Sequence, residues 1–454
     1  MKQVVILGGG PAGLYAALLL ARRGIPATVL ERESRPGGLT AGTEVAGIAV
    51  DYGSHRLHPS TDPDILADLR SILGDDLQTR DRNGRIRFDG SWIGFPLSPG
   101  EMVKKVSPST LARLALGAVG AMLRPARADN FAAFIETGLG TPMGDLFYFP
   151  YARKIWGVEP DRLSGEQARR RVSADTPWRL MGKALKRDGA GRRFFYPRRG
   201  FGQIAAGLAS AAREAGSDVR LGVTAQGVTR LDHGLQVATS DVDIEAGLIL
   251  STVPITLLAR FMGPPDHVVA AVESLHYRAM VLVYLTVSRG QWTGFDAHYF
   301  PEEEVPFTRI SEPKNYRDGI DPEDRTVICV EIPTDFDDDV WSADDGALID
   351  SVRDQVVDVG LPDPGSAGHV HRIRHAYPIY LTGSETAFDT VASWLDTMDG
   401  IVTFGRQGLF AHDNTHHAMA MARDAVSCVS DDLEFDRSGW EEARARFAHH
   451  VVED

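Results

Sequence analysis

The sequence predicts an α/β fold assembled from separated stretches of the chain, with an inserted helical region and a second, β-sheet domain. Two observations predict it. The chain opens with a strand, a glycine-rich turn, a helix and a second strand, and a β-rich stretch begins only near residue 218, after a long and mostly helical interval. Alternating strand and helix patterns favour a parallel sheet, and the return after a long insertion indicates a discontinuous domain.

The opening unit is built from three segments. Lys2–Leu7 is a short apolar run, Pro11–Arg23 has helical spacing, and Ala27–Leu30 is a second buried strand that ends on Glu31. Short apolar runs beside a glycine turn are typical of parallel strands. We therefore predict a β-α-β unit.

The remaining chain divides by pattern. Residues 61–194 are expected to be mainly helical, 263–397 to form a β-sheet substrate region, and 433–454 to be a helical tail. The segments 1–60, 195–262 and 398–432 are predicted to form the nucleotide-binding domain.

The turn between the first strand and helix, GGGPAG, has chemistry of its own. Gly8 permits the tight turn, Gly10 lets a pyrophosphate approach the backbone, and Gly13 lets the helix pack close to the strand. The helix then points free N–H groups and a partial positive charge at the phosphates. Glu31 is placed to accept hydrogen bonds from a ribose. The order of these features predicts a Rossmann-type dinucleotide site rather than a generic glycine turn.

A second loop indicates which dinucleotide is bound. Arg35, Pro36, Gly37 and Gly38 follow the acid at once, and a second close backbone approach suits a long cofactor lying along the sheet. A second glycine fingerprint for a nicotinamide domain is not found in the sequence. Resident FAD is therefore favoured over NAD.

The stretches GGGPAGL, ERESRPGGLT, DYGSHRLHP, FYFPYARKIWGVEP and FGRQGLFAHDNTHH together resemble the superfamily of amine oxidases, protoporphyrinogen oxidase and UDP-galactopyranose mutase. The resemblance spans about residues 3–430 and is nearest to the mutase-like branch. It implies non-covalent FAD. The sequence departs from the mutase pattern at Ser54, before His55, and at Gln167, where a tryptophan is common, which weakens the expectation of UDP binding.

The resemblance also implies roles for matched positions. Gly405 and Arg406 are expected against the flavin, the helix after Asn414 is expected to point its N-terminus at the flavin ring, and Val223, in a strand, is expected to contact adenine through its backbone. The predicted cofactor-binding residues are Gly8, Gly10, Pro11, Ala12, Gly13, Glu31, Arg32, Gly38, Leu39, Thr40, Ser54, His55, Val223, Gly405, Arg406, Asn414 and Thr415.

The candidate catalytic residues are His55, Tyr377 and Arg309, and the candidate substrate-binding residues are Arg171, Tyr299, Arg309 and Tyr377. A partly buried guanidinium such as Arg309 needs an anion, either a structural carboxylate or a substrate phosphate. A basic run in this acidic chain is either a solvated helix face or a field that attracts an anionic substrate. Its members are Arg169, Arg170, Arg171, Arg179, Lys183, Lys186, Arg187, Arg192, Arg193, Arg198 and Arg199.

Two reactions follow from this reading. In the first, a polar and anionic substrate of sugar or nucleotide type transfers hydride to flavin N5 while His55 or Tyr377 takes a proton. In the second, reduced FAD acts as an N5 nucleophile in an isomerisation of a sugar nucleotide, which needs an external reductant such as NAD(P)H. A non-catalytic flavin-binding protein is a third alternative.

Composition excludes several other functions. The net charge of −14 argues against nucleic-acid binding. Cys329 and Cys428 are predicted to be small core residues, and no metal is expected, since His412, Asp413, His416 and His417 lie beside a flavin loop. Leu111–Leu123 is apolar but too short to span a membrane, so we expect a packed helix, no membrane contact and a cytoplasmic protein. The oligomeric state is not predicted.

Overall fold

The computed structural model describes residues 3–95, 99–171, 193–448, 450 and 452. Part of the predicted basic run, residues 179–192, lies outside them.

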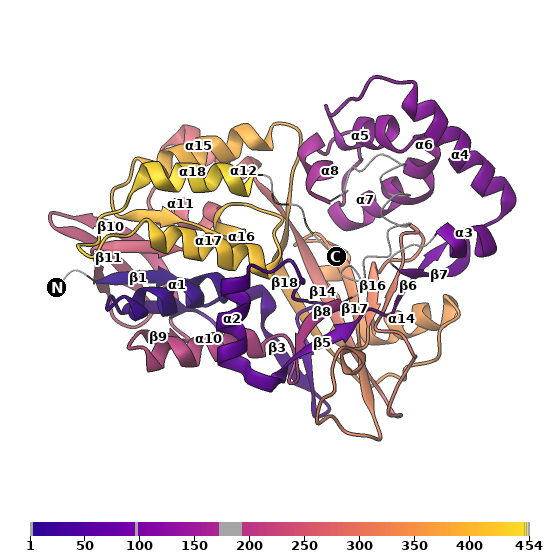
Figure 1. The fold of residues 1–454 in the computed structure, drawn as a ribbon, viewed down its shortest axis with the longest axis horizontal. Helices are drawn as coiled ribbons and strands as arrows, with labels where there is room; N and C mark the ends of the chain where they lie inside the picture. The colour runs from indigo at the N-terminus through magenta and orange to yellow at the C-terminus, as the bar shows by residue number, and fades with distance from the viewer. Residues whose placement is uncertain (1–2, 96–98, 172–192, 449, 451, 453–454) are drawn as a thin grey trace.

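A five-stranded parallel sheet forms the first of two halves (Figure 1). Its strand order is β19-β13-β1-β2-β9, and the registers of all four pairs are parallel. The strands are β1 (Val4–Leu7), β2 (Ala27–Glu31), β9 (Asp218–Leu221), β13 (Leu248–Ser251) and β19 (Ile401–Thr403). Strands from the start, the middle and the end of the chain thus share one sheet, which confirms the predicted discontinuous Rossmann-type fold.

Helices cover one face of this sheet. The apolar sides of three helices pack together against it around Tyr15, Leu208 and Met419. These helices are α1 (Pro11–Arg22), α10 (Gln203–Glu214) and α17 (Thr415–Ser427).

The opposite face is covered by the antiparallel sheet β10-β11-β12 and three helices. The elements are β10 (Ala225–Leu231), β11 (Gly234–Thr239), β12 (Ile244–Ala246), α11 (Ile255–Phe261), α12 (Asp266–Ser274) and α15 (Ser384–Asp396). The parallel strands are therefore buried on both sides, as their continuous apolar sequences require.

A seven-stranded sheet of order β18-β14-β17-β16-β15-β6-β7 forms the second half. Long antiparallel strands build its centre, and β14 and β17 are almost wholly buried. The strands are β6 (Gly84–Phe88), β7 (Ser91–Phe95), β14 (His276–Val287), β15 (Ala297–Tyr299), β16 (Arg309–Ser311), β17 (Thr326–Thr334) and β18 (Gly368–Ile379), and α14 (Asp345–Asp358) packs on one face.

The region predicted to be mainly helical also contains strands. The β6–β7 hairpin extends the seven-stranded sheet, because β6 pairs in parallel with β15, and β5 (Leu77–Asp81) pairs with β8 (Arg193–Pro197). The helices of this region are α2 (Pro63–Leu73), α3 (Pro99–Lys105), α4 (Pro108–Met122), α5 (Phe131–Gly138), α6 (Thr141–Met143), α7 (Phe149–Trp156) and α8 (Gly165–Arg171). The local pattern of β6 does not reveal its distant partner.

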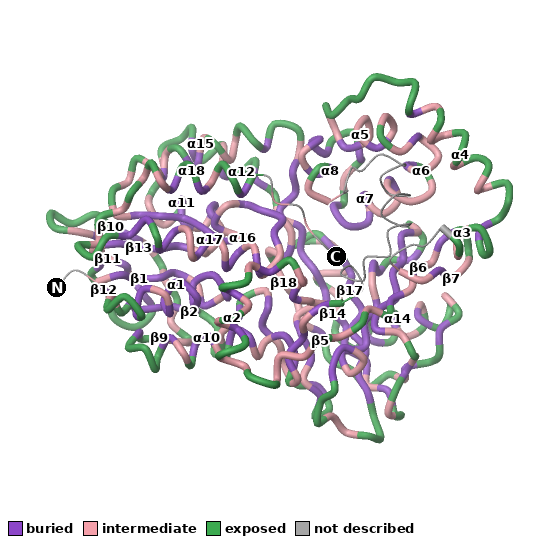
Figure 2. Tube along the Cα trace, in the orientation of Figure 1, coloured by how far each residue is buried: buried purple, intermediate pink, exposed green. Residues whose placement is uncertain are grey.

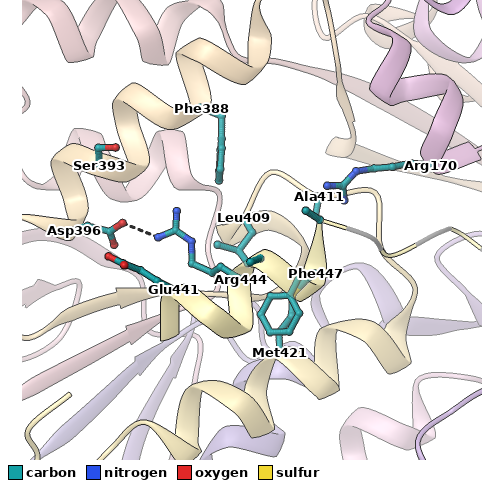
Figure 3. Close-up of a pocket in the computed structure, with 12 residues that line it drawn as sticks. Arg170, Phe388, Ser393, Asp396, Leu409, Ala411, Met421, Glu441, Arg444 and Phe447 are labelled. Atoms are coloured by element: carbon teal, nitrogen blue, oxygen red, sulfur yellow. Dashed lines mark hydrogen bonds and ion pairs between the residues drawn. The ribbon is translucent and has the colours of Figure 1, made fainter. Parts of the chain in front are cut away.

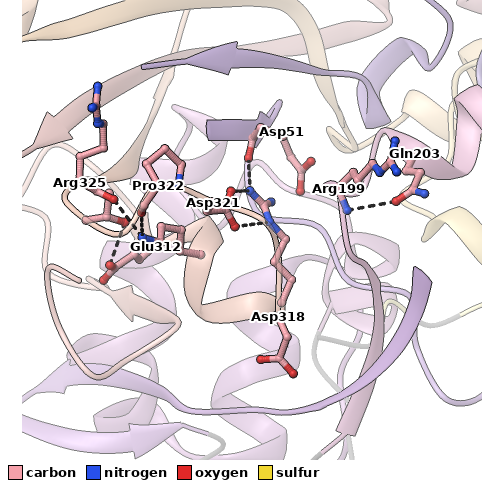
Figure 4. Close-up of polar contacts among 12 residues, drawn as sticks. Asp51, Arg199, Gln203, Glu312, Asp318, Asp321, Pro322 and Arg325 are labelled. Atoms are coloured by element: carbon pink, nitrogen blue, oxygen red, sulfur yellow. Dashed lines mark hydrogen bonds and ion pairs between the residues drawn. The ribbon is translucent and has the colours of Figure 1, made fainter. Parts of the chain in front are cut away.

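Buried polar contacts connect β4 (Ile48–Asp51), which pairs with β3 (Gly42–Val45), to the segments packed around it (Figure 4). The carboxylate of Asp51 accepts hydrogen bonds from the Phe201 amide at 2.8 Å and from the Tyr196 hydroxyl. Arg317 donates to the Ala49 carbonyl at 2.9 Å. Burial raises the pKa of Asp51 to about 6. These contacts fix the chain just before Ser54 and His55.

Helix α4 departs from the sequence expectation. Its inner face packs on α5 and α6, where Gly117 lies under Pro142, but Leu116 is 74% exposed and Leu123 is 84% exposed. Figure 2 shows α4 at the edge of the molecule with much of its trace exposed. In the described part of the chain, no helix is both long enough and apolar enough to cross a membrane.

Candidate functional site

The carboxyl ends of the parallel strands bring the predicted cofactor residues together. Gly8 follows β1, Glu31 ends β2, Thr252 follows β13, and Gly405 lies two residues beyond β19. In open α/β sheets this edge is where ligands bind. Residues separated by almost 400 positions therefore line one edge.

The three fingerprint glycines occupy three different environments. Gly8 has a φ of +104°, and a Cβ there would lie 2.4 Å from the Thr252 hydroxyl. A Cβ on Gly13 would lie 2.1 Å from the Gly8 carbonyl, so α1 packs directly on the turn. A Cβ on Gly10 meets nothing closer than the Gly37 carbonyl at 3.8 Å. Gly10 therefore faces an open side of the loop, the cradle that a pyrophosphate would occupy.

The second glycine loop lies against the first. The Gly37 amide donates to the Gly9 carbonyl at 2.8 Å, and a Cβ on Gly38 would lie 3.7 Å from the Gly10 Cα. Leu39 and Thr40 continue this loop as a 3-10 turn, with the Thr40 hydroxyl bonded to the Gly37 carbonyl. Both loops thus border the space beside the N-terminus of α1, where Pro11 and Ala12 begin the helix.

Glu31 is buried and held in place by backbone groups. Its carboxylate accepts from the Gly9 amide at 2.7 Å and the Glu33 amide at 3.0 Å. Each oxygen of the Glu31 carboxylate keeps a further lone pair, which could accept a hydrogen bond from a ribose hydroxyl. Arg32 is exposed and pairs with Glu33.

The strand assignment of Val223 is wrong. Val223 lies in the loop between β9 and β10, and its amide donates to the Glu31 carbonyl at 2.9 Å. An adenine contact through this backbone would therefore use the Val223 carbonyl oxygen.

The last cofactor segment places a cation and a helix end at the same edge. A Cβ on Gly405 would lie 3.2 Å from the Ala12 Cβ, so α16 (Gly405–Gly408) lies against the first turn of α1. Arg406 donates to the carbonyls of Asp413 and Ala376, and its buried Nε has no hydrogen-bond partner within the described part of the chain. Asn414 caps α17, which begins at Thr415.

Arg406 is a partly buried cation without an ion-pair partner among the described residues. Burial lowers the pKa of Arg406 and the charge of Arg171 lowers it further, while the nearby Tyr377 and Asp413 oppose this only in part. A partly buried guanidinium of this kind, beside a helix N-terminus, fits the electron-rich edge of a reduced flavin.

His55 lies between two arginines. Its Nδ1 is 3.2 Å from the Gly53 carbonyl, and its ring stacks on Phe201. Burial, followed by the charges of Arg309 and Arg406, lowers the pKa of His55 to about 3. His55 is therefore neutral at neutral pH, donates through Nδ1 and leaves Nε2 as an acceptor. A group this weakly basic does not suit the predicted role of general base.

Arg309 has the structural carboxylate that the sequence analysis named as one alternative. It forms a two-point pair with Glu331, with Nε and Nη2 at 2.9 and 2.7 Å from the carboxylate oxygens, and Nη2 also contacts the Ser54 carbonyl. Glu331 also accepts from the Ser54 amide at 2.8 Å. The pair therefore anchors the loop that carries Ser54 and His55.

Tyr299 belongs to a second buried charge network. Its hydroxyl accepts from Arg56 at 3.1 Å, while Arg56 pairs with Asp296 at 3.3 Å. The guanidinium of Arg309 lies 5.8 Å from the centre of the Tyr299 ring. Arg56, Asp296 and Glu331 are functional neighbours that the sequence analysis did not list, since their pairing depends on long-range strand register.

Tyr377 lies close to two guanidinium groups. The Cζ atoms of Arg171 and Arg406 are 5.3 and 5.5 Å from the centre of its ring, and His412 stacks on it. Within the described ranges, Arg171 and Arg406 form no ion pair, in contrast to Arg309. The predicted residues Arg171, Tyr377 and Arg406 therefore define a positively charged centre.

A pocket opens next to the segments that carry Arg171 and His412. It has a volume of about 420 Å³ and opens between α15, α17 and α18 (Arg437–Phe447), where Arg444 pairs with Asp396 (Figure 3). None of the predicted catalytic, substrate-binding or cofactor-binding residues lines this pocket. The lining residues are Arg170, Phe388, Ser393, Asp396, Leu409, Ala411, Met421, Glu441, Arg444, Ala445, Phe447 and Ala448.

In the histidine-rich segment 412–417, the fold directs the side chains to different places. Ligand atoms of Asp413, His417 and His450 lie within 4.8 Å of one another, a grouping that the local sequence did not indicate because His450 comes from the tail. His412 is turned away toward Tyr377 and Tyr380.

Comparison with known proteins defines the class. The flavin-containing amine oxidoreductase model matches residues 11–426, so the chain belongs to this family, as the sequence predicts. The Gly10 cradle and the two apposed glycine loops fit the flavin cofactor for which this family is named.

Two curated relatives illustrate the family. The chain is 29% identical over 298 residues to a phytoene dehydrogenase of Streptomyces griseus and 28% identical over 268 residues to a putative flavin-containing monoamine oxidase, AofH, of Mycobacterium tuberculosis. These matches cover 59% and 56% of this chain and 57% of each relative. The match therefore spans little more than half the length of these relatives.

Solved structures share the whole architecture. A reduced UDP-galactopyranose mutase superposes with a TM-score of 0.83 at 21% identity, covering 100% of both chains. A putative protoporphyrinogen oxidase from Exiguobacterium superposes with a TM-score of 0.74 at 19% identity, covering 94% of this chain and 98% of the other. At these identities the likeness establishes the fold.

Proposed function

We propose that this chain is a FAD-dependent oxidoreductase that oxidises a polar, anionic small molecule of sugar or nucleotide type. The observation that carries the proposal is the placement of Arg171 and Arg406 about the ring of Tyr377, neither of them paired with a carboxylate in the described part of the chain. Two partly desolvated cations beside each other are costly unless an anion joins them.

The positions of the two cations suggest a different ligand for each. Arg406 lies in the segment after β19, against the first turn of α1, and is assigned to the cofactor. Arg171 ends α8 on the helical side of the site and is assigned to the substrate anion. Its buried Nε has no hydrogen-bond partner among the described residues, which leaves a donor for the substrate anion.

When bound, FAD supplies a two-electron acceptor whose N5 takes a hydride from a substrate carbon. The protein supplies orientation and proton transfer. Tyr377 is the candidate to take the substrate proton in its ionised form, an anion that the guanidinium groups of Arg171 and Arg406 would stabilise before it is neutralised by that proton. His55, neutral and with Nε2 available, positions a substrate hydroxyl by accepting its hydrogen bond.

Three finer points belong to the same proposal. The FAD-binding domain comprises 1–60, 195–262 and 398–432, FAD is held without a covalent bond, and the protein acts in the cytoplasm. The last point rests on the sequence alone.

The first experiment compares Arg171→Ala with Arg169→Ala. Arg169 is on the same helix, but it is exposed and bonded to Glu166. Loss of a charge-assisted contact of about 2–3 kcal/mol should raise the KM for an anionic substrate by about 30- to 150-fold in Arg171→Ala. Arg169→Ala should match the wild type. Equal KM values for all three proteins would remove Arg171 from the site.

A second candidate is the isomerisation of a sugar nucleotide by the reduced enzyme, which the likeness to reduced UDP-galactopyranose mutase supports at the level of fold. Anaerobic incubation of the oxidised enzyme with candidate sugar nucleotides separates the two. Bleaching of the flavin absorbance supports oxidation. Turnover that requires dithionite or NAD(P)H, without net redox change, supports isomerisation.

A further inference from the structure

Helix α4 carries two apolar faces, and the fold covers one of them. Leu114, Ala118 and Ala121 face α5, α6 and the neighbouring core. On the other side lies a stripe at helical spacing, which we call the outer face of α4: Ala112, Ala115, Leu116, Val119, Met122 and Leu123.

These positions form a continuous surface by geometry. With about 100° between successive residues, Ala112, Leu116, Val119 and Leu123 lie within one narrow sector of the helix. Leu116 and Leu123 are the two most exposed side chains of this sector, and Val119 and Met122 are exposed beside them. Val103 of the preceding helix α3 adds another exposed apolar side chain. Clustered exposure of this kind marks a contact surface, in contrast to scattered single residues.

Basic side chains outnumber acidic ones along the helices that carry the outer face of α4, although the chain as a whole has a net charge of −14. Lys105, Arg113 and Arg127 pair with Glu101, Asp145 and Asp129, whereas Lys104 and Arg124 form no ion pair with the described residues. Residues 99–127 contain one acid, Glu101, and five basic residues: Lys104, Lys105, Arg113, Arg124 and Arg127. Arg113 and Arg124 lie about 100–120° from Ala112 around the helix, at one border of the apolar stripe. All five basic side chains are exposed.

This charge pattern indicates which kind of partner the outer face of α4 binds. A symmetric contact with a second copy would bring the same basic border against itself, with repulsion between like charges. A bilayer that contains anionic lipid offers both an apolar layer for the Leu and Val side chains and negative headgroups for the Lys and Arg side chains.

We propose that the outer face of α4, with its basic border, docks this enzyme on the surface of an anionic membrane, with α4 lying in the plane of the interface. The proposal departs from the expectation, drawn from the sequence, of a packed helix without membrane contact. The proposal is independent of the reaction, since none of the residues involved belongs to the candidate site.

The test uses the full chain and vesicles of defined composition. Wild-type protein is mixed with vesicles of phosphatidylcholine alone or of phosphatidylcholine with about 30% phosphatidylglycerol, an anionic lipid that attracts basic side chains. The bound fraction is measured by flotation. The first variant combines Leu116→Ser, Val119→Ser and Leu123→Ser. The matched control combines Ile320→Ser and Val242→Ser, two exposed apolar residues elsewhere. A charge variant combines Lys104→Glu and Arg124→Glu.

We expect binding to the anionic vesicles that decreases with added salt, on the order of tenfold weaker partitioning for the Ser variant and for the charge variant, and unchanged partitioning for the control. Thermal denaturation should be the same for all the proteins, because the substituted side chains are exposed. Absence of wild-type binding, or equal binding by the Ser variant, would overturn the proposal. A dimer that the Ser variant converts to a monomer would also overturn it and would assign the outer face of α4 to a second copy of the chain.

Discussion

Gly10→Ala separates cofactor binding from folding more cleanly than any other substitution at the glycine loop. Gly10 has φ −77° and ψ 173°, a conformation that alanine adopts without strain. The added methyl group meets no atom closer than 3.8 Å. The apoprotein should therefore be as stable as the wild type, or more stable by about 0.4–1 kcal/mol, because the unfolded chain loses freedom.

The same methyl group projects into the space assigned to the pyrophosphate. Moving the phosphates away from the loop weakens one or two charge-assisted hydrogen bonds, each worth about 1.5–3 kcal/mol. The dissociation constant for FAD should rise by about 10- to 150-fold. The assay titrates apoprotein with FAD and follows flavin fluorescence, with thermal denaturation of the apoprotein measured in parallel.

Gly13→Ala is the matched control. Its methyl group would lie 2.1 Å from the Gly8 carbonyl and 3.2 Å from Ile6 Cγ2, so the substitution should destabilise the apoprotein itself, by about 3 kcal/mol. The reasoning is refuted if Gly10→Ala binds FAD as tightly as the wild type, or if Gly10→Ala and Gly13→Ala destabilise the apoprotein equally.

Three further predictions concern ionisable side chains that the fold removes from water. Glu331→Ala leaves Arg309 without its two-point partner and should lower the free energy of unfolding by about 3–5 kcal/mol in urea denaturation; an unchanged midpoint would contradict this. Lys154, with Nζ bonded to the Phe300 carbonyl, has its pKa lowered by burial from 10.5 to about 7. Between those values the unfolded chain binds the extra proton, so stability should rise with pH by up to about 1.4 kcal/mol per unit, and Lys154→Met should abolish this part of the slope. His55, with its pKa lowered to about 3, should show no titration of its ring by NMR between pH 5 and 8, and an inflection there would refute its neutral, accepting role.

The parts of the fold that could be predicted from the sequence are those encoded locally. The β1-α1-β2 unit matches its predicted limits within about two residues, because apolar runs, a glycine turn and helical spacing all fall in one short segment. The hairpin of β6 and β7 was not predicted, since its assignment depends on pairing with β15, more than two hundred residues away.

The candidate site shows the same division. Resemblance identified Arg309, Tyr377 and Arg406, and the fold places Arg309 and Arg406 near His55 and Arg406 beside the Tyr377 ring. The residue types alone could not show that Arg309 is neutralised by Glu331 whereas Arg171 and Arg406 form no ion pair within the described residues. That difference arises from the register between β16 and β17, in which Arg309 lies opposite Glu331.

The measurement that tests the central claim most directly is the amount of flavin that the purified chain holds. The protein should show flavin absorbance with one FAD per chain, released intact on denaturation, and the apoprotein should recover that absorbance when FAD is added back. A colourless protein whose apo form takes up no FAD would contradict the assignment of the two glycine loops and of Arg406 to a resident flavin.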